Sequence, residues 1–436
     1  MSLRTQLLLA AMTALAVPLA AHAQPPAAAA AAARTPLAER AQDVIAIING
    51  DGDPAALFTP AFLAQVPPEQ LRAISAQIVQ QYGRAVRVAG LAPRDDNSGT
   101  LDIATERGTL HIRIGIEAAP PHRIANLLVT GADLNGDTIE AVLAEIRALP
   151  GATGVALARL GDEGPRTIAS AAPDRPLAIG STFKLFVLAE LDRQVRAGER
   201  QWTDVVRLGA RSAPSGIMQN WPADAPVTLH TLATLMISIS DNTATDTLLR
   251  IVGRENVERM MATIGVSTAA RNRPFLSTME LFSLKAAPEP AFAAWRDADE
   301  AGRRAILARD YAEPDPARLP PTLFADGPAR IDSVEWFVTP DDLVRTMDWL
   351  RRNTSDTARA ILAVNPGNAA LRGDFAYVGF KGGSEPGVIN LTWLLQGRDG
   401  AWYTATGSWN NPDAVVDEQR FLTLMTRAVT QLARGS

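Results

Sequence analysis

The chain has 436 residues, a length that favours two domains; 47% of its residues are apolar and 20% are charged. The 42 Lys and Arg and 47 Asp and Glu residues give a net charge of −5, and no basic stripe with interleaved aromatic residues points to nucleic acid. The absence of cysteine excludes disulfides, thiol catalysis, cysteine metal ligands and a lipid anchor of the lipobox type.

The N-terminus is predicted to be a cleavable signal peptide over residues 1–23. An apolar core runs from Leu7 to Leu19, and Ala21-His22-Ala23 has the small-x-small pattern of a cleavage site. The apolar run is too short to cross a bilayer comfortably, so we expect no stable membrane insertion. A periplasmic or secreted protein is therefore expected, with an Ala/Pro-rich linker over residues 24–35.

Residues 36–130 are predicted to form a small α+β domain. Helical periodicity covers Leu37–Ile48 and Pro68–Tyr82. Within the second helix, the residues expected on one buried face are Leu71, Ile74, Ile78 and Val79. Strand-like alternation follows over residues 85–88, 99–105, 108–115 and 124–129. Helices followed by a curved meander resemble the cone of cystatin-like and nuclear-transport-factor-2-like domains.

Residues 136–434 are predicted to form a second domain. It begins with a helix over residues 137–149 and two strands, and a long, mostly helical middle follows. The predicted strands are 154–159, 166–170, 375–381, 388–396 and 402–409, and the last helix covers 415–433. Strands at both ends with helices between them indicate a mixed α and β domain.

Ser181-Thr182-Phe183-Lys184 places a hydroxyl group and an amine one helical turn apart. Residues i and i+3 share a helix face, so Ser181 Oγ and Lys184 Nζ can meet. The apolar run over residues 185–188 would bury Lys184 and lower its pKa, so that a neutral amine could take the proton of Ser181. A serine at a helix start is also a common N-cap, and the two roles are compatible.

Two further motifs follow in the chain, Ser240-Asp241-Asn242 and Lys381-Gly382-Gly383. The order S-x-x-K, S-D-N, K-x-G is the signature of penicillin-recognising serine enzymes, and the surroundings resemble class A β-lactamases over roughly residues 136–434. The resemblance implies an α/β sandwich in which an antiparallel sheet is flanked by a helical subdomain. With its N-terminal cystatin/NTF2-like domain, the chain is also similar to a β-lactamase-like protein encoded with clavulanic acid biosynthesis.

The resemblance implies a role for each motif residue. Ser181 would be the nucleophile, Lys184 the general base, and Ser240 the donor of a proton to the leaving group. The backbone N–H groups of Ser181 and Ser384 would form the oxyanion hole. No metal or cofactor is implied. The substrate-binding positions would be Asn242, Lys381, Gly383 and Ser384.

Two motif positions, Asp241 and Gly382, are not expected to act on the substrate. Asp241 is expected to have a structural role as the N-cap of the helix that follows it. Gly382 stands where the family commonly has a hydroxyl residue, so Ser384 would have to serve as the hydroxyl donor to a substrate carboxylate.

The larger departure concerns the acid that activates the deacylating water in class A enzymes. The stretch over residues 242–340 is longer than in that family and contains no clean E-x-x-L-N motif. The inserted residues would remodel the rim of the site. Glu280 and Glu335 are the candidate deacylation acids, although Glu280 also fits a capping box with Ser277 and Glu335 fits a surface or salt-bridge role.

The leading interpretation is a secreted serine hydrolase of β-lactamase type that forms an acyl-enzyme at Ser181 on a small-molecule β-lactam or ester. One alternative is an esterase or amidase with weak or no β-lactamase activity. Another is a D,D-peptidase-like penicillin-binding protein, and a third is a binding protein that keeps only the fold. The intact motif order argues against the last, because a binder needs neither Ser181 nor Lys184. The sequence does not define the oligomeric state.

Overall fold

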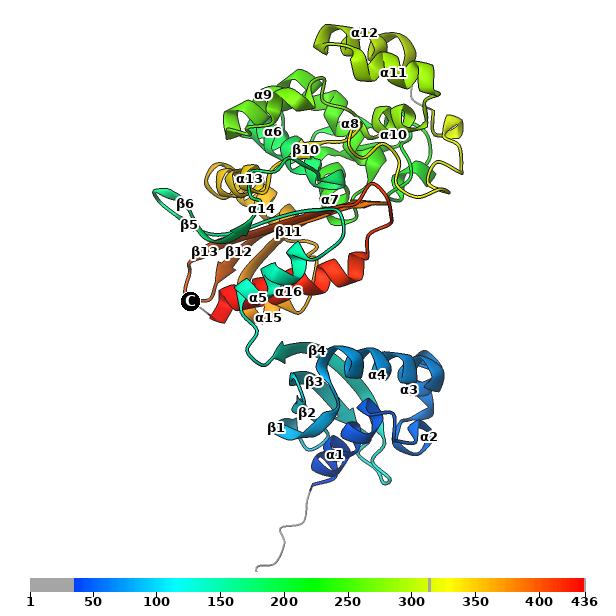
Figure 1. The fold of residues 1–436 in the computed structure, drawn as a ribbon, viewed down its shortest axis with the longest axis vertical. Helices are drawn as coiled ribbons and strands as arrows, with labels where there is room; N and C mark the ends of the chain where they lie inside the picture. Colours follow the sequence, from blue (N-terminus) through cyan, green and yellow to red (C-terminus); the bar gives the residue numbers. More distant parts are fainter. Residues whose placement is uncertain (1–34, 313–314, 435–436) are drawn as a thin grey trace, which may run out of the picture. The chain divides into compact units, whose positions relative to one another are not determined.

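The computed structural model describes residues 35–312 and 315–434. They form two compact units that divide between Leu128 and Val129, with residues 107–110 grouped with the second unit (Figure 1). The expected signal peptide, and all of the expected linker except Thr35, lie outside the described residues. None of the described helices combines the length and the apolar content that crossing a membrane requires.

The N-terminal unit has helices followed by an antiparallel meander, which confirms the predicted α+β class. Every helix begins with proline at its first position, where the missing N–H costs no hydrogen bond. The helices are α1 (Pro36–Ile48), α2 (Pro54–Leu57), α3 (Pro60–Gln65) and α4 (Pro68–Tyr82). The sheet order is β1-β2-β3-β4, with bounds Ala85–Asp95, Ser98–Thr105, Gly108–Ile116 and Ile124–Leu134.

The buried face of α4 differs from the predicted one. Ile74 is 38% exposed, whereas Leu71 and Ser75 are buried. Ser75 Oγ donates a hydrogen bond of 3.0 Å to the carbonyl of Ile47 in α1, which satisfies the buried hydroxyl. The predicted face is therefore wrong at Ile74, because a serine with a local acceptor occupies the inward position.

The C-terminal unit is built on a five-stranded antiparallel sheet in the order β11-β12-β13-β5-β6. The strands that open and close this unit thus share one sheet, as predicted. Helices α5 and α16 cover one face and the helical subdomain lies on the other (Figure 1). The strands are β5 (Ala152–Gly161), β6 (Gly164–Ala171), β11 (Phe375–Glu385), β12 (Val388–Gly397) and β13 (Trp402–Asn410).

The remaining elements of the C-terminal unit are helices and short two-stranded pairs. The longer helices are α5 (Ile139–Arg147), α6 (Lys184–Arg196), α7 (Leu229–Ser238), α8 (Asn242–Val252), α9 (Arg254–Ile264), α10 (Thr278–Ala286), α11 (Glu289–Asp297), α12 (Glu300–Asp310), α13 (Pro340–Asn353), α14 (Asp356–Leu362) and α16 (Glu418–Arg434). The shorter elements are β7 (Leu177–Ala178), η1 (Gly180–Phe183), β8 (Val205–Arg207), η2 (Met218–Asn220), β9 (Pro226–Thr228), η3 (Ala269–Asn272), η4 (Pro316–Arg318), β10 (Phe337–Val338) and α15 (Leu371–Asp374).

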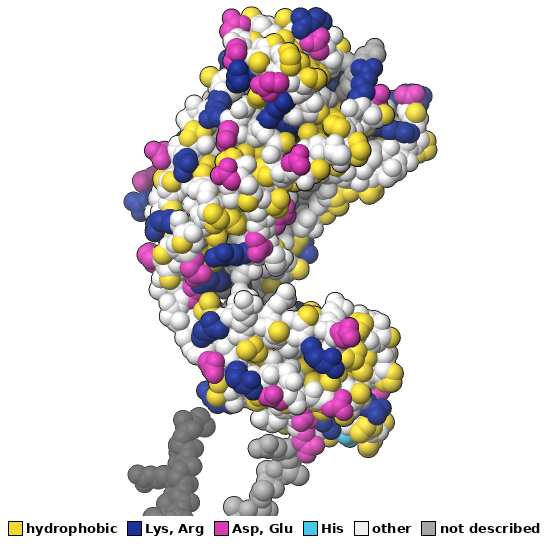
Figure 2. All heavy atoms as spheres, turned by 45° about the vertical axis from the view of Figure 1, so that its right-hand side comes forward, with side chains coloured by type: hydrophobic (Ala, Val, Ile, Leu, Met, Phe, Trp, Pro, Cys, Tyr) yellow, Lys and Arg dark blue, Asp and Glu magenta, His cyan; other side chains and the backbone are white. Residues whose placement is uncertain are grey.

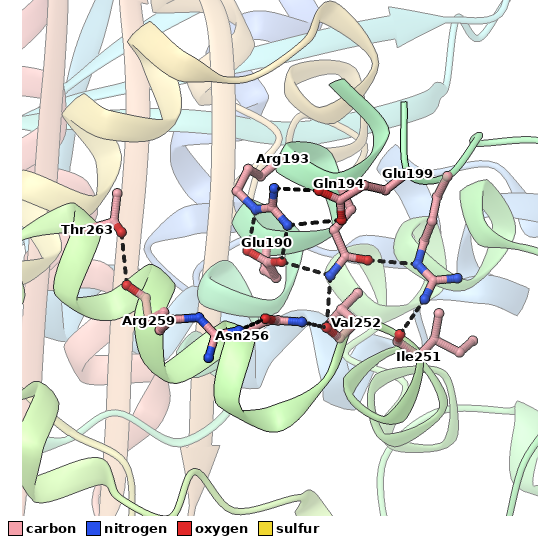
Figure 3. A network of polar contacts seen from close by, with 10 residues as sticks. Glu190, Arg193, Gln194, Glu199, Ile251, Val252, Asn256, Arg259 and Thr263 are labelled. Atoms are coloured by element: carbon pink, nitrogen blue, oxygen red, sulfur yellow. Dashed lines mark hydrogen bonds and ion pairs between the residues drawn. The ribbon is translucent and has the colours of Figure 1, made fainter. Parts of the chain in front are cut away.

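Helix α6 is tied at its far end to α8 and α9 by a polar network (Figure 3). The buried carboxylate of Glu190 accepts hydrogen bonds from Arg193 Nε at 2.9 Å and from Gln194 Nε2 at 2.7 Å. Gln194 Nε2 also donates to the carbonyl of Val252, the last residue of α8, at 2.8 Å. Because these buried polar groups are hydrogen-bonded, the network holds α6 in place, and with it Lys184 at its first turn.

Basic and acidic side chains are interspersed on the face of the C-terminal unit that Figure 2 shows. Such mixing leaves no broad field of a single sign over that face. The electrostatics of any site in this unit therefore depend on the groups packed directly around it.

Candidate active site

Ser181 lies in the tight turn η1, between β7 and α6. Gly180 has a φ of +47°, in the left-handed region that favours glycine. A Cβ atom on Gly180 would lie 3.2 Å from the backbone nitrogen of Ser384, and one on Gly383 would lie 2.4 Å from the nitrogen of Ser181. The two glycines therefore allow the turn and strand β11 to approach closely. This brings the N–H groups of Ser181 and Ser384, which are expected to form the oxyanion hole, close together.

The hydroxyl of Ser181 is not used as a helix cap. The residue at the N-cap position of α6 is Phe183, and neither η1 nor α6 has a side-chain capping hydrogen bond. Instead, Ser181 Oγ accepts a hydrogen bond of 3.0 Å from Lys184 Nζ. The pair predicted from the i, i+3 spacing is thus formed.

Lys184 Nζ is surrounded by uncharged oxygen atoms. Besides Ser181 Oγ, it contacts Ser240 Oγ at 2.9 Å, the Ser240 carbonyl at 2.8 Å and Asn242 Oδ1 at 2.8 Å. The lysine side chain is fully buried, and Leu185 to Leu188 are at most 1% exposed. Burial lowers the pKa of Lys184 well below its usual range, and the nearby charge of Lys381 lowers it further. A neutral amine beside a serine hydroxyl is the arrangement that a general base requires.

Ser240 bridges the two lysines of the site. Its Oγ accepts hydrogen bonds from Lys184 and, at 3.1 Å, from Lys381 Nζ. The residue has a φ of +59°, a backbone conformation that is strained for residues other than glycine. Asp241, next in the chain, accepts hydrogen bonds from three backbone N–H groups, those of Ile217, Met218 and Ala244. These bonds confirm the expected N-cap role of Asp241 and hold Ser240 in its unusual conformation.

Lys381 lies on β11 and is 3% exposed. Burial lowers its pKa to about 7. At the next position, a Cβ atom on Gly382 would lie 2.8 Å from Cζ of Phe380 and 3.3 Å from the carbonyl oxygen of Asn390. The ring of Phe380 therefore occupies the space that a hydroxyl side chain at this position would need.

A pocket of about 300 Å³ lies beside Ser181. Of the predicted site residues, Ser181, Ser240, Lys381, Gly383 and Ser384 lie in its wall. Lys184 and Asn242 do not line it, and are buried in contact with each other at 2.8 Å. Sequence reasoning missed several lining residues that come from loops, strands and helix ends: Ser215, Ile237, Ser238, Ile239, Asn365, Phe380, Ile389, Leu391 and Glu418. Asn365 begins an Asn-Pro-Gly turn, a signal for a loop, but only the fold brings its Nδ2 to the carbonyl of Ser238 at 2.8 Å.

The two candidate deacylation acids are engaged elsewhere, and neither is among the residues that line this pocket. Glu280 forms the predicted capping box with Ser277 and an ion pair of 2.6 Å with Arg254. Glu335 is buried in an ion pair of 3.1 Å with Lys285. None of the described residues between 242 and 340 is in the pocket wall, and the expectation that the inserted residues remodel the rim of the site stays a prediction.

Comparison with known proteins gives one family and a set of similar folds. The sequence model of the beta-lactamase enzyme family matches residues 137–314, which include the S-x-x-K and S-D-N motifs. A beta-lactamase from Sphaerobacter thermophilus is 23% identical, with a TM-score of 0.50, over 68% of this chain and 97% of that one. A beta-lactamase from Xanthomonas campestris is 19% identical, with a TM-score of 0.47, over 67% and 97% of the two chains. PBP-A is 16% identical, with a TM-score of 0.47, over 68% and 96%. None of the curated proteins compared is significantly similar to this chain.

Proposed function

We propose that the C-terminal unit is a serine hydrolase of the penicillin-recognising superfamily, which forms an acyl-enzyme at Ser181 with β-lactams. The observation that carries this proposal is the contact between Ser181 Oγ and a buried lysine whose other partners are all uncharged. In that setting burial lowers the pKa of the amine well below its usual range, which favours the neutral form that accepts the proton of the serine.

Acylation then follows from the positions of four groups. Lys184 Nζ takes the proton of Ser181, and Ser181 Oγ forms a bond to the carbonyl carbon of the substrate. The N–H groups of Ser181 and Ser384 stabilise the negative charge that develops on the carbonyl oxygen. As the C–N bond breaks, Ser240 gives its proton to the leaving nitrogen and regains one from Lys184, which contacts it at 2.9 Å.

Slow deacylation is the second part of the proposal. Glu418, an exposed residue at the start of α16, supplies the one carboxylate among the described residues that line the pocket. Neither Glu280 nor Glu335 is free to activate a water there. The acyl-enzyme formed with a β-lactam is therefore expected to persist, which favours a penicillin-binding protein, or an esterase with weak or no β-lactamase activity, over a fast β-lactamase.

The test uses Ser181→Ala, with Ser215→Ala as the matched control, because Ser215 lines the same pocket but contacts no base. A fluorescent penicillin should label the unchanged protein and the control and should not label Ser181→Ala. Hydrolysis of nitrocefin and of p-nitrophenyl acetate, measured in parallel, ranks β-lactam against ester turnover. Labelling that survives in Ser181→Ala would overturn the assignment of the nucleophile.

Export from the cytoplasm is also part of the proposal, since β-lactams and cell-wall peptides are encountered outside the cytoplasm. It rests on the signal-peptide pattern of residues 1–23. The intact mass of the mature protein, purified from the periplasmic or extracellular fraction, should correspond to a chain that begins at Gln24. A cytoplasmic protein that keeps residues 1–23 would contradict it.

A further inference from the structure

A second pocket, of about 240 Å³, lies in the C-terminal unit and shares no lining residue with the Ser181 pocket. Its walls come from the connection between η3 and α10, from the inserted helices α11 and α12, and from residues 332–337. The guanidinium-bearing residues that line it are Arg271, Arg273, Arg296 and Arg303, and we call this site the arginine pocket. Trp295, Trp336 and Phe337 supply apolar surface.

Three of these arginines have no carboxylate partner in the described part of the chain. Arg303 donates to the backbone carbonyls of Trp295 and Arg296, at 3.2 and 3.1 Å. Arg271 donates to the carbonyl of Asp332 at 3.3 Å and lies over the ring of Phe337 at 3.6 Å. Arg273 has no carboxylate within ion-pair distance among residues 35–312 and 315–434. Only Arg296 has such partners, Asp297 and Glu289.

The acidic groups that line the arginine pocket do not neutralise it. Glu335 pairs with Lys285, which is itself fully buried. Asp332 is exposed and accepts from Arg271 through its backbone oxygen. Three arginines without an ion-pair partner among the described residues, Arg271, Arg273 and Arg303, therefore share one unpaired lining carboxylate, that of Asp332, so the pocket carries an excess of positive charge.

Two buried donors at this pocket also lack an acceptor. Trp336 is 4% exposed, and its indole Nε1 has no hydrogen-bond partner; Arg273 Nε is buried and equally without one. A buried N–H group left without an acceptor is costly, so such groups are rare unless a bound molecule supplies the acceptor. Both donors belong to residues that line the same pocket, and an oxyanion there would provide acceptor oxygens as well as the missing negative charge.

We propose that the arginine pocket binds a small oxyanion, a carboxylate or a phosphate, at a site separate from the substrate pocket of Ser181. Guanidinium groups recognise both classes through paired N–H donors in a planar fork. The volume lies below the roughly 300–1,000 Å³ of pockets for drug-sized ligands, which restricts the ligand to a small one. The ring of Trp336, which lines the arginine pocket, also stacks on the ring of Phe183, with the ring centroids 3.6 Å apart. The wall of the arginine pocket therefore contacts the turn that carries Ser181.

The experiment measures binding of inorganic phosphate and of acetate to the mature chain by calorimetric titration, at constant ionic strength. All proteins carry Lys381→Gln, which removes the exchangeable cation of the substrate pocket. The double variant Arg273→Gln/Arg303→Gln should bind the preferred anion at least tenfold more weakly. The control Arg309→Gln changes an exposed arginine on the same helix, α12, and should bind as before. The preferred probe identifies phosphate or carboxylate as the class of ligand.

Equal affinity in the double variant, or no binding of either anion to the protein with its arginines intact, would overturn the proposal. A second measurement does not depend on the fold of a variant. In the unchanged protein, the preferred anion should slow hydrogen exchange over residues 271–276 and 295–303. Binding without protection of these two segments would place the anion elsewhere and would equally overturn it.

Discussion

Lys184 and Lys285 are both buried, and the oxygen atoms around their amines differ in charge. The four acceptors around Lys184 Nζ are hydroxyl, carbonyl and amide oxygens, all uncharged. Lys285 Nζ contacts the carboxylates of Glu335 and Glu385. Burial lowers the pKa of Lys184, whereas at Lys285 the two carboxylates outweigh burial and raise the pKa. Burial thus sets the cost of a charge, and the charge of the partners decides whether a lysine is a base or a structural cation.

The cluster of Lys285, Glu335 and Glu385 also has a place in the architecture of the site. Burial and the neighbouring Glu335 raise the pKa of Glu385 well above its usual range, whereas Lys285 lowers it. Glu385 follows Ser384 on β11, and Lys285 lies on α10. The cluster therefore fastens the strand that carries Lys381 to the helical subdomain, while Lys184 is left for chemistry.

The largest expected effect comes from Lys184→Met. Removal of the general base should slow acylation of Ser181 by a fluorescent penicillin by roughly 10²–10⁴-fold. The melting temperature should fall less than in Lys285→Met, because the buried amine forms hydrogen bonds but no ion pair that stabilises the fold. Stopped-time labelling and thermal unfolding measure the two quantities. A loss of stability without a loss of acylation rate would reverse the assigned roles.

Lys285→Met should do the opposite. It leaves two buried carboxylates without their cation, and breaking a buried pair in this way costs about 3–5 kcal/mol. The free energy of unfolding in urea measures the loss. The triple variant Lys285→Met/Glu335→Gln/Glu385→Gln should recover most of it, because no buried charge remains. A single variant as stable as the unchanged protein would show that the cluster contributes nothing to the fold.

Lys381 is a third buried lysine, and its charge should make acylation by benzylpenicillin depend on pH. The half-saturating concentration is expected to change by about tenfold. Its pKa is lowered by burial to about 7, so the ammonium is present below that pH and lost above it. The charged fraction falls from about 0.9 at pH 6 to about 0.1 at pH 8, so the half-saturating concentration of benzylpenicillin for acylation should rise by roughly tenfold. The ester p-nitrophenyl acetate has no carboxylate and is the control. Lys381→Arg should remove the dependence, and a dependence that persists would assign it to another group.

The smallest effect is expected from Glu280→Gln and Glu335→Gln. Their contacts with Arg254 and Lys285 are structural, so the penicilloyl adduct on Ser181 should persist for about as long as in the unchanged protein. Mass spectrometry of the intact protein over time measures the adduct. If the unchanged protein turned over penicillin fast, and only one variant accumulated the adduct, that glutamate would be the water-activating base.

Local patterns were sufficient to predict much of the C-terminal unit. The five strands of its sheet and the helix that closes it were located from periodicity alone, although β11 and β5 extend beyond the predicted ends. The contact between Ser181 and Lys184 was expected because i and i+3 residues meet whenever the backbone turns. At Ile74 the same reasoning was wrong, since an apolar residue was preferred over a serine whose acceptor lies in another helix.

Features that depend on segments far apart in the chain could not be anticipated in this way. The left-handed backbone of Ser240 lies beside the bonds that Asp241 forms with Ile217 and Met218. The pKa of Lys285 is raised by Glu335 and Glu385, which come from segments far along the chain. The arginine pocket likewise joins residues from 271 to 337. Periodicity and short motifs report on neighbours within one or two turns of the chain. The pKa of a buried lysine, and the excess charge of a pocket, are instead set by desolvation and by charges that other segments bring, and these exist only once the chain has folded.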